Sequence, residues 1–379
     1  NVLVIHEEFA EHLAAMEAEK QIRANEDAAE AQIAVIGPAG ENQVTFATIS
    51  HDGRHAGRGG HGAVLGSKNV KAVLVRGKQR VEWADPETLY RLSKELSAKS
   101  FGPATAKYRE LGTAANLLVF NRLSLLPTRN FRDGQLEDPT PLAPETLEKT
   151  RGKIRKSCAA CTIGCEHLYG GNGETPVRVE YESLFALGAN CGINDPDIVL
   201  EACRRCDALG LDTISTGGTI AFAMECAEKG LIPDAPVTFG NGESLLRMIE
   251  QIGAREGIGN QLANGSRAMA RGLGEQAELL TAEIKGLELP GYEPRGLTAM
   301  AIGLAVAARG ADHNRSGAYE ADFSGEVTHG EFSPATVEAV VASEDRAAVM
   351  DSMILCKFVR GVFEDYYAES AAMLEAVTG

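Results

Sequence analysis

Hydrophobic and polar positions divide the chain into regions with different secondary structure. In residues 1–80 a helical period over 7–24 is followed by strand-like runs at 32–37, 43–50 and 71–77, with glycine-rich turns between them. From about residue 85 the period is mostly helical. Helices are predicted at 85–100, 195–210 and 242–257, each with Asp, Asn or Gly near its start, and further helical patterns lie at 299–310 and 344–377. The sequence therefore predicts a β-rich start followed by mainly helical regions.

Composition narrows the class of protein. The chain has 379 residues, enough for two or three domains with substantial cores. Its formal net charge of −16 argues against nucleic acid, which attracts basic surfaces. No apolar run approaches the ~20 residues needed to cross a bilayer, and eight cysteines are too sparse for a disulfide scaffold. We therefore expect a cytoplasmic protein without membrane contact. Because the chain starts at Asn1 without Met and stops abruptly at Gly379, we also expect it to be part of a longer polypeptide.

The loop "GRHAGRGGHGAVLGSKN" formally satisfies the G-x-G-x-x-G pattern of dinucleotide-binding proteins. That fold needs a full helix after the loop and an acid at the end of the next strand, whereas here the helix is short and the strand ends in Arg76 and Gly77. A nicotinamide site is therefore disfavoured. Two interpretations remain. The loop is an ordinary turn between strands, or it allows close approach of a ligand whose phosphate or carboxylate is bound by Arg54 and Arg58.

Three cysteines in "SCAACTIGC", namely Cys158, Cys161 and Cys165, have C-x2-C-x3-C spacing. A zinc ribbon would need a second pair or two histidines, and bacterial ferredoxins use C-x2-C-x2-C. Three thiols on one tight loop with a distant fourth suit a 4Fe–4S cluster, because each iron takes one thiolate. The cluster is favoured, and zinc or plain structural thiols stay open as alternatives.

The remaining cysteines differ in their surroundings. Cys191 and Cys226 lie in apolar sequence, and Cys203 and Cys206 lie inside a predicted helix. Packing is the favoured interpretation for all four. Cys356 instead ends the segment "DSMILC", which echoes the segment "DALGLD".

Two aspartates bracket a predicted chain reversal. A helix with Pro196 in its first turn stops at Gly210, so Asp207 lies in its last turn and Asp212 at the start of the next helix. An acid at the C-terminal end of a helix opposes the macrodipole, which favours a functional role for Asp207. The alternative is that Asp212 only caps the second helix and Asp207 is solvated.

Six segments, in order along nearly the whole chain, carry a resemblance to a known family: "GRHAGRGGHGAVLGSKNVKAV", "SCAACTIGC", "VEYESLFALGANCGI", "DALGLDTIS", "RGADHNR" and "DSMILC". Together they resemble the tungsten-containing aldehyde:ferredoxin oxidoreductase family. The resemblance implies an α+β fold, with residues 1–80 as the end of a β-rich cofactor domain and two mainly helical domains at 81–285 and 286–379. It also implies that Cys356 is the fourth ligand of a 4Fe–4S cluster, although Met353 and Ile354 stand where Gly is common in the motif.

Members of this family bind tungsten through two pterins, which Arg, Asp and closely approaching backbone hold in place. The resemblance therefore implies a tungsten bis-pterin cofactor, with a magnesium ion bridging the pterin phosphates as a further component. It assigns the pterin and phosphate contacts to Arg54, His55, Gly57 and Arg58, to Asp207, Leu211 and Asp212, to Asp351 and Leu355, and to Arg309, Gly310 and Arg315.

The same resemblance implies oxidation of an aldehyde to a carboxylic acid, with electrons leaving singly through the cluster to a ferredoxin or ferredoxin-like subunit. Glu182 and His313 are the implied acid/base groups. Glu180 competes with Glu182, because on a strand both would share one face.

The acidic chain would not steer an acidic ferredoxin, so the basic stretch 151–156 is a candidate docking site. An oligomer stays open. So do two other functions: a low-potential reductase on the same scaffold that acts on aryl-CoA thioesters, and a cluster- or zinc-bearing module without catalysis.

Overall fold

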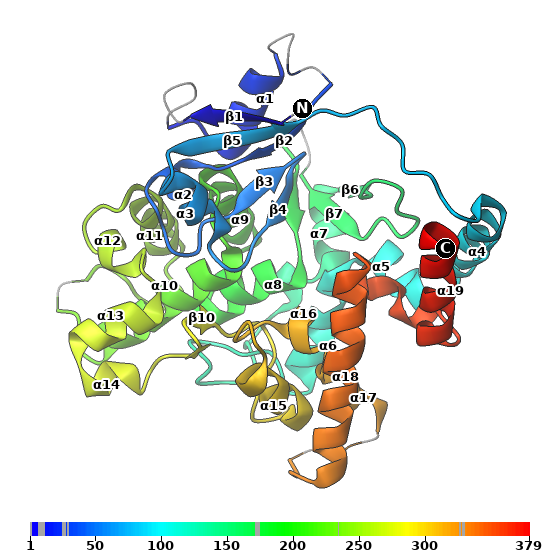
Figure 1. Cartoon of the computed structure of the whole chain (residues 1–379). Coiled ribbons are helices and arrows are strands. Elements are labelled where there is room, and N and C mark those ends of the chain that lie inside the picture. Colours follow the sequence, from blue (N-terminus) through cyan, green and yellow to red (C-terminus); the bar gives the residue numbers. More distant parts are fainter. Residues whose placement is uncertain are drawn as a thin grey trace.

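The protein is described by a computed structural model that covers residues 2–6, 12–24, 28, 30–170, 175–233, 235–325, 327 and 330–379. Figure 1 shows a small layer of strands from the start of the chain above a larger helical body. This α+β architecture confirms the β-rich start and the mainly helical remainder predicted from the sequence. Within these described parts, no helix combines the length and the apolar character that crossing a bilayer requires.

The N-terminal layer is a five-stranded antiparallel sheet with the order β1–β5–β2–β3–β4. Its strands are β1 (Val2–His6), β2 (Gln32–Val35), β3 (Ile49–His51), β4 (Arg54–Ala56) and β5 (Val70–Val75). Helix α1 (Ala15–Arg23) closes a small core in which Ala18 and Ile22 pack with Ile33 and Leu74. The sequence predicted β2 and β5, missed β1, and placed a strand at 43–50 of which only the end is a strand. The predicted helix at 7–24 is observed from Ala15, and its residues 7–11 lie outside the described ones.

Helices α9 (Pro196–Leu209), α10 (Thr213–Glu228) and α11 (Gly242–Ala254) lie at the centre of the main core. The other helices are α2 (Pro38–Glu41), α3 (His61–Gly66), α4 (Pro86–Ser100), α5 (Ala106–Glu110), α6 (Asn116–Arg122), α7 (Pro144–Arg151), α8 (Tyr181–Ser183), α12 (Gly259–Leu262), α13 (Ser266–Leu273), α14 (Glu275–Glu278), α15 (Thr298–Val306), α16 (His313–Ser316), α17 (Tyr319–Ser324), α18 (Pro334–Ser352) and α19 (Tyr366–Thr378). Pro in the first turn and an Asp N-cap begin both α4 and α9, so these predicted helices form where expected.

A second sheet interrupts the region that was predicted to be helical. Its strands are β6 (Lys153–Lys156), β7 (Glu166–Tyr169) and β8 (Val177–Val179), in that order and antiparallel. The cysteine loop is the connection between β6 and β7. A short two-stranded pair, β9 (Glu283–Ile284) and β10 (Leu287–Glu288), lies further along the chain.

The N-terminal layer meets the helical body at the turn between α9 and α10. Gly210 ends α9 with φ of 77°, the left-handed conformation that favours glycine at this position. A Cβ on Gly37 would lie 2.4 Å from the carbonyl oxygen of Leu209, so only glycine allows this approach. Leu211 forms a β-bridge with Ala47. These backbone contacts bring the glycine-rich loop close to the predicted Asp207–Asp212 turn.

Candidate functional site

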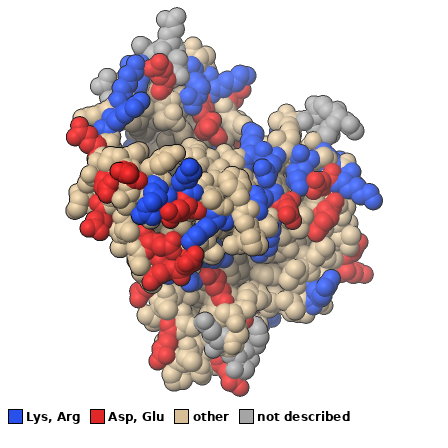
Figure 2. All heavy atoms as spheres, turned by 90° about the vertical axis from the view of Figure 1, so that its right-hand side faces the viewer, with Lys and Arg blue, Asp and Glu red and all other residues tan. Residues whose placement is uncertain are grey.

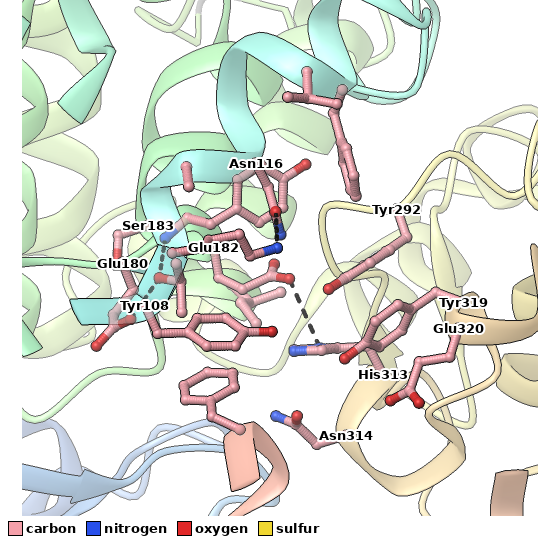
Figure 3. A pocket seen from close by; sticks show the side chains of 18 of the residues that line it. Tyr108, Asn116, Glu180, Glu182, Ser183, Tyr292, His313, Asn314, Tyr319 and Glu320 are labelled. Atoms are coloured by element: carbon pink, nitrogen blue, oxygen red, sulfur yellow. Dashed lines mark hydrogen bonds and ion pairs between the residues drawn. The ribbon is translucent and has the colours of Figure 1, made fainter. Parts of the chain in front are cut away.

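A cavity of about 750 Å³ lies beside this junction (Figure 3). Its lining comes from segments far apart in the sequence: the glycine-rich loop, the region of α5 and α6, residues 180–183, the start of α10, and residues 292–324 and 358–360. The volume falls within the range of about 300–1,000 Å³ that small-molecule sites occupy. Four of the predicted site residues line it: His55, Arg58, Glu182 and His313.

Glu182 and His313 face each other in this cavity. Glu182 Oε1 lies 3.7 Å from His313 Nδ1, and both side chains are largely buried. The other oxygen, Oε2, accepts a hydrogen bond from the backbone N–H of Gly291 at 2.9 Å. Within the described residues, Glu182 Oε1 and His313 Nδ1 form no hydrogen bond. Burial raises the pKa of Glu182, while His313 acts to lower it. The pair therefore offers a carboxyl that holds its proton more firmly than usual, next to an imidazole.

Glu180 is directed elsewhere, because the expected strand over 180–182 is wrong. β8 ends at Val179, and Glu180 is the residue just before the helical turn α8. Its Oε2 accepts a hydrogen bond from Thr113 Oγ1 at 2.6 Å. Burial raises the pKa of Glu180, and Arg54 and Arg178 oppose that rise. Both acids line the cavity, but only Glu182 contacts His313.

The glycine-rich loop and the α9–α10 turn are joined by two acid–base pairs. His55 Nε2 lies 3.2 Å from Asp207 Oδ1, and Arg58 Nε donates to Asp212 Oδ2 at 3.3 Å. Asp212 also caps α10 by accepting from two backbone N–H groups. The capping alternative for Asp212 therefore holds, whereas Asp207 is half-buried and paired rather than solvated.

Arg58 is buried, and protein groups occupy three of its nitrogens: Asp212 accepts from one, and the carbonyls of Ala311 and Glu288 accept from the other two at 2.5 and 2.6 Å. Its guanidinium therefore fixes the loop against two other segments. By contrast, a Cβ on Gly57 would meet no atom within 4 Å, so the loop is open to solvent or a ligand at that residue.

The segment "RGADHNR" joins the same junction. Arg309 Nη2 donates to the carbonyl of Arg58 at 2.6 Å, and Nη1 pairs with Asp312 at 3.0 Å. Burial acts to raise the pKa of Asp312, but His313, Arg309 and Arg58 bring it below its ordinary value. Gly310 has φ of 87° and lies against the carbonyl of Ile284, which accounts for glycine here through backbone packing.

The second aspartate motif lies at the end of α18. Asp351 pairs with Lys357 at 2.8 Å and with Arg315 at 3.6 Å, and Leu355 is half-buried. Ile354, which stands where Gly is common in the resembled motif, has φ of 56° and is 93% exposed. A β-branched residue is strained in this left-handed conformation, which explains why the turn suits glycine.

Cys356 lies within electrostatic range of all three cysteines of the cysteine loop, Cys158, Cys161 and Cys165. Burial raises the pKa of the Cys165 thiol to about 12, and the charges of Cys356 and Cys161 also raise it. Burial likewise raises the pKa of the Cys356 thiol, and the charges of Cys161 and Cys158 also raise that pKa. Cys158 and Cys356 are exposed, whereas Cys191, Cys203, Cys206 and Cys226 are buried, as predicted. In the described parts of the chain no three His, Cys, Asp or Glu side chains lie close enough to hold a single metal ion.

Arg54 connects the glycine-rich loop to the cysteine loop. Its Nη1 lies 2.9 Å from Glu166 Oε2, at the start of β7. Burial acts to lower the pKa of Arg54, but the negative charges of Cys158, Glu166 and Glu180 raise it above its ordinary value. This cation therefore lies between the cavity side and the thiols.

Sequence reasoning missed most of the aromatic wall of the cavity. Tyr292 stacks on His313 with ring centroids 5.2 Å apart, and Phe120 contacts Tyr292 edge-on at 5.6 Å. Neither residue lies in a recognisable motif, and no signal in the sequence marks them. Only the fold brings these rings together.

A buried acid–imidazole pair in a cavity, with thiols from two distant segments within electrostatic range of each other, is typical of an enzyme that holds a redox cofactor. Comparison with known proteins defines the class further. A family model described as "Aldehyde ferredoxin oxidoreductase, domains 2 & 3" matches residues 88–379, and one described as the N-terminal domain of the same family matches residues 4–77. The chain belongs to the aldehyde ferredoxin oxidoreductase family.

Relatives include tungsten-containing aldehyde ferredoxin oxidoreductases of two organisms. The protein of Pyrococcus furiosus is 39% identical over 96% of this chain and 62% of its own length, and that of Thermococcus kodakarensis is 39% identical over 92% and 59%. This chain thus spans about three fifths of their length. An aliphatic sulfonate oxidoreductase subunit of P. furiosus is 30% identical over 86% of this chain and 52% of its own. A solved structure of the active-site complex BamBC of benzoyl coenzyme A reductase, bound to 1,5-dienoyl-CoA, has a TM-score of 0.66 and 26% identity, and covers 79% of this chain and 49% of that one.

Proposed function

We propose that this chain carries the acid/base groups and the electron exit of an enzyme that oxidises aldehydes to carboxylic acids. The observation that carries the proposal is the Glu182–His313 pair, whose facing atoms lie 3.7 Å apart in the cavity and form no hydrogen bond within the described residues. The relatives whose names state tungsten and aldehyde oxidation support this reaction class.

The residues around the cavity fit a large cofactor with polar edges. Glu182 Oε1, His313 Nδ1 and His55 Nε2 are buried and form no hydrogen bond in the described structure, and a side chain at Gly57 would meet open space. When bound, a tungsten bis-pterin supplies a two-electron acceptor at the substrate carbon. The proposed pterin-binding residues fall into two groups. The first group is on the glycine-rich loop and the α9–α10 turn and comprises Arg54, His55, Gly57, Asp207 and Leu211. The second group is at the end of α18 and in α16 and comprises Arg315, Asp351 and Leu355. The glycine-rich loop of the first group is fixed in place by Arg58, Asp212, Arg309 and Gly310. A magnesium ion that would neutralise pterin phosphates is part of the same proposal.

The overall reaction joins one water oxygen to the carbonyl carbon, breaks the aldehyde C–H bond, and releases two electrons and two protons. Glu182 and His313 would serve as the acid/base groups of this reaction. Ionised Glu182 accepts a proton as water is added, and His313 donates a hydrogen bond to the carbonyl oxygen and so polarises it. The stack of Tyr292 on the imidazole holds the ring in place for this contact.

We propose that Cys158, Cys161, Cys165 and Cys356 bind a 4Fe–4S cluster through which the electrons leave singly. Three of these thiols come from one loop and the fourth from the segment after α18, and Arg54 lies beside them. Exposure of Cys158 and Cys356 supports an exit at the surface.

The electron acceptor is proposed to be a ferredoxin or a ferredoxin-like subunit that docks at β6. This edge strand precedes Cys158, and Arg155 and Lys156 are exposed on it. In the part of the chain that the structure describes, neither cation has an ion-pair partner, whereas Lys153 pairs with Glu148 at 2.6 Å. Figure 2, seen from the side of α4 and α19, shows Lys and Arg side chains gathered in places on this face although the chain is acidic. Such local charge favours an acidic partner.

Elemental analysis and activity together test the proposal. We expect about one tungsten and four irons per chain in protein purified without oxygen, and aldehyde-dependent reduction of a viologen dye. Zinc alone would contradict it and favour a non-catalytic module. Tungsten and iron without aldehyde oxidation would favour the alternative of a low-potential reductase that acts on aryl-CoA thioesters. The similarity to the BamBC complex supports testing this alternative.

A further inference from the structure

Aromatic side chains dominate the apolar lining of the cavity. Among the described residues that line it, seven are Phe or Tyr, against three aliphatic ones, Ala115, Val119 and Ile214. The whole chain contains only 12 Phe and 8 Tyr, so over a third of them line this one cavity. The seven are Tyr108, Phe120, Tyr181, Tyr292, Tyr319, Phe323 and Phe358.

These rings form a continuous wall that begins at the acid/base pair. Tyr292 stacks on His313 and, at 4.9 Å, on Tyr319. Phe120 contacts Tyr292 edge-on at 5.6 Å and stacks on Phe323 at 5.6 Å. Figure 3 shows His313, Tyr292 and Tyr319 together on one side of the pocket. A substrate whose reacting carbon lies at His313 would therefore place the rest of its structure along aromatic faces.

The outer part of the wall offers uncovered ring surface. Phe323 is 45% exposed although it lines the cavity, whereas Phe120 behind it is 5% exposed. Tyr108 and Phe358, from segments 250 residues apart, stack at 4.2 Å and add a second aromatic surface. Covering exposed aromatic surface with a ligand is favourable. It is more favourable when the ligand is itself an aromatic ring that can make stacked or edge-to-face contacts.

We infer that the substrate of this site is an aldehyde carried on an aromatic ring, rather than one carried on an aliphatic chain. The inference rests on the proposed aldehyde oxidation and adds the class of substrate to it. Stacked and edge-to-face contacts need planar π-systems, which an alkyl chain of equal volume does not supply. A cavity that binds aliphatic substrates can be lined by branched aliphatic side chains alone, and this cavity has few of them.

A matched pair of substrates tests the inference. Phenylacetaldehyde and cyclohexylacetaldehyde have six-membered rings of similar size, and the methylene group insulates the carbonyl from the ring in both. We expect kcat/KM to be at least about tenfold higher for phenylacetaldehyde, measured by viologen reduction without oxygen, because one or two ring contacts suffice for that ratio. Equal values, or a preference for the cyclohexyl compound, would overturn the inference and leave the proposed function intact. Oxidation of neither would overturn both.

Variants of the exposed ring locate the preference. Phe323→Leu keeps apolar volume but removes the ring, so the ratio of the two kcat/KM values is expected to fall several-fold, and Phe323→Tyr is expected to keep it. Val119→Ala is the matched control, since Val119 lines the same cavity without a ring. It is expected to affect both substrates alike. A ratio unchanged in Phe323→Leu, in protein whose thermal unfolding is normal, would contradict the role of this wall.

Discussion

Oε1 of Glu182 and Nδ1 of His313 lie 3.7 Å apart in the cavity, and neither atom has a hydrogen bond in the described structure. The two residues come from α8 and α16, which the fold brings together across the cavity. Burial raises the pKa of Glu182, and both residues line the cavity, where a substrate can reach them.

If the pair acts as one unit, its variants will not be additive. Glu182→Gln and His313→Asn are each expected to lower kcat by about 10²–10⁴-fold, and the double variant by little more than the worse single one. Glu180→Gln, the same chemical change two residues away, is expected to cost much less. Viologen reduction with saturating aldehyde measures all four. Equal losses in Glu180→Gln and Glu182→Gln would contradict the assignment of Glu182.

The buried carboxyl also predicts how stability depends on pH. Because the pKa of Glu182 is raised in the folded state, the native protein holds this proton more tightly than the unfolded chain. The stability that protonated Glu182 contributes to the folded state is therefore fully present below its unfolded pKa of about 4.5. It is lost as pH rises through the pKa of Glu182 in the folded state. Gln mimics the neutral acid and has no such loss. We expect Glu182→Gln to melt at a higher temperature than wild type near neutral pH and to show a shrinking difference as pH falls. A difference independent of pH would contradict this.

Removing the thiol of Cys356 tests whether this cysteine binds the cluster or is only structural. Cys356→Ala is expected to lose most of its iron and its low-temperature EPR signal, because a 4Fe–4S cluster takes four thiolates. Cys226→Ala, at a buried cysteine of α10, is the control and is expected to keep both. A normal cluster spectrum in Cys356→Ala would refute the assignment of this ligand.

Charge reversal on β6 tests the docking site. The double variant Arg155→Glu, Lys156→Glu is expected to raise KM for an acidic ferredoxin about tenfold or more and to weaken its salt dependence, with an unchanged rate for viologen. Lys68→Glu, at an exposed lysine just after α3, is the control. Equal effects of the two variants on the ferredoxin reaction would place docking elsewhere.

The sequence was most informative where structure is decided locally. The helix from Pro196 to Gly210 and the cap at Asp212 follow from capping chemistry and form as predicted. Local signals failed for β6–β8, which are three or four residues long and too short for a clear period. They also failed for Glu180, where a helical turn replaced the expected strand.

The site could be predicted only in part, because much of it is built by tertiary contacts. The nearness of Cys356 to the cysteine loop came from family resemblance, since no local pattern links residues so far apart. The pairing of His55 with Asp207, and of Arg309 with the carbonyl of Arg58, depends on the junction of sheet and helices. The aromatic wall around Tyr292 has no motif at all.

Product and electron balance together test the central claim most directly. In water labelled with oxygen-18 and without dioxygen, wild-type protein should convert an aldehyde to acid that carries at least one labelled oxygen, with two viologens reduced per acid, and Glu182→Gln should slow both in parallel. Absence of acid, or dye reduction without acid formation, would contradict the account.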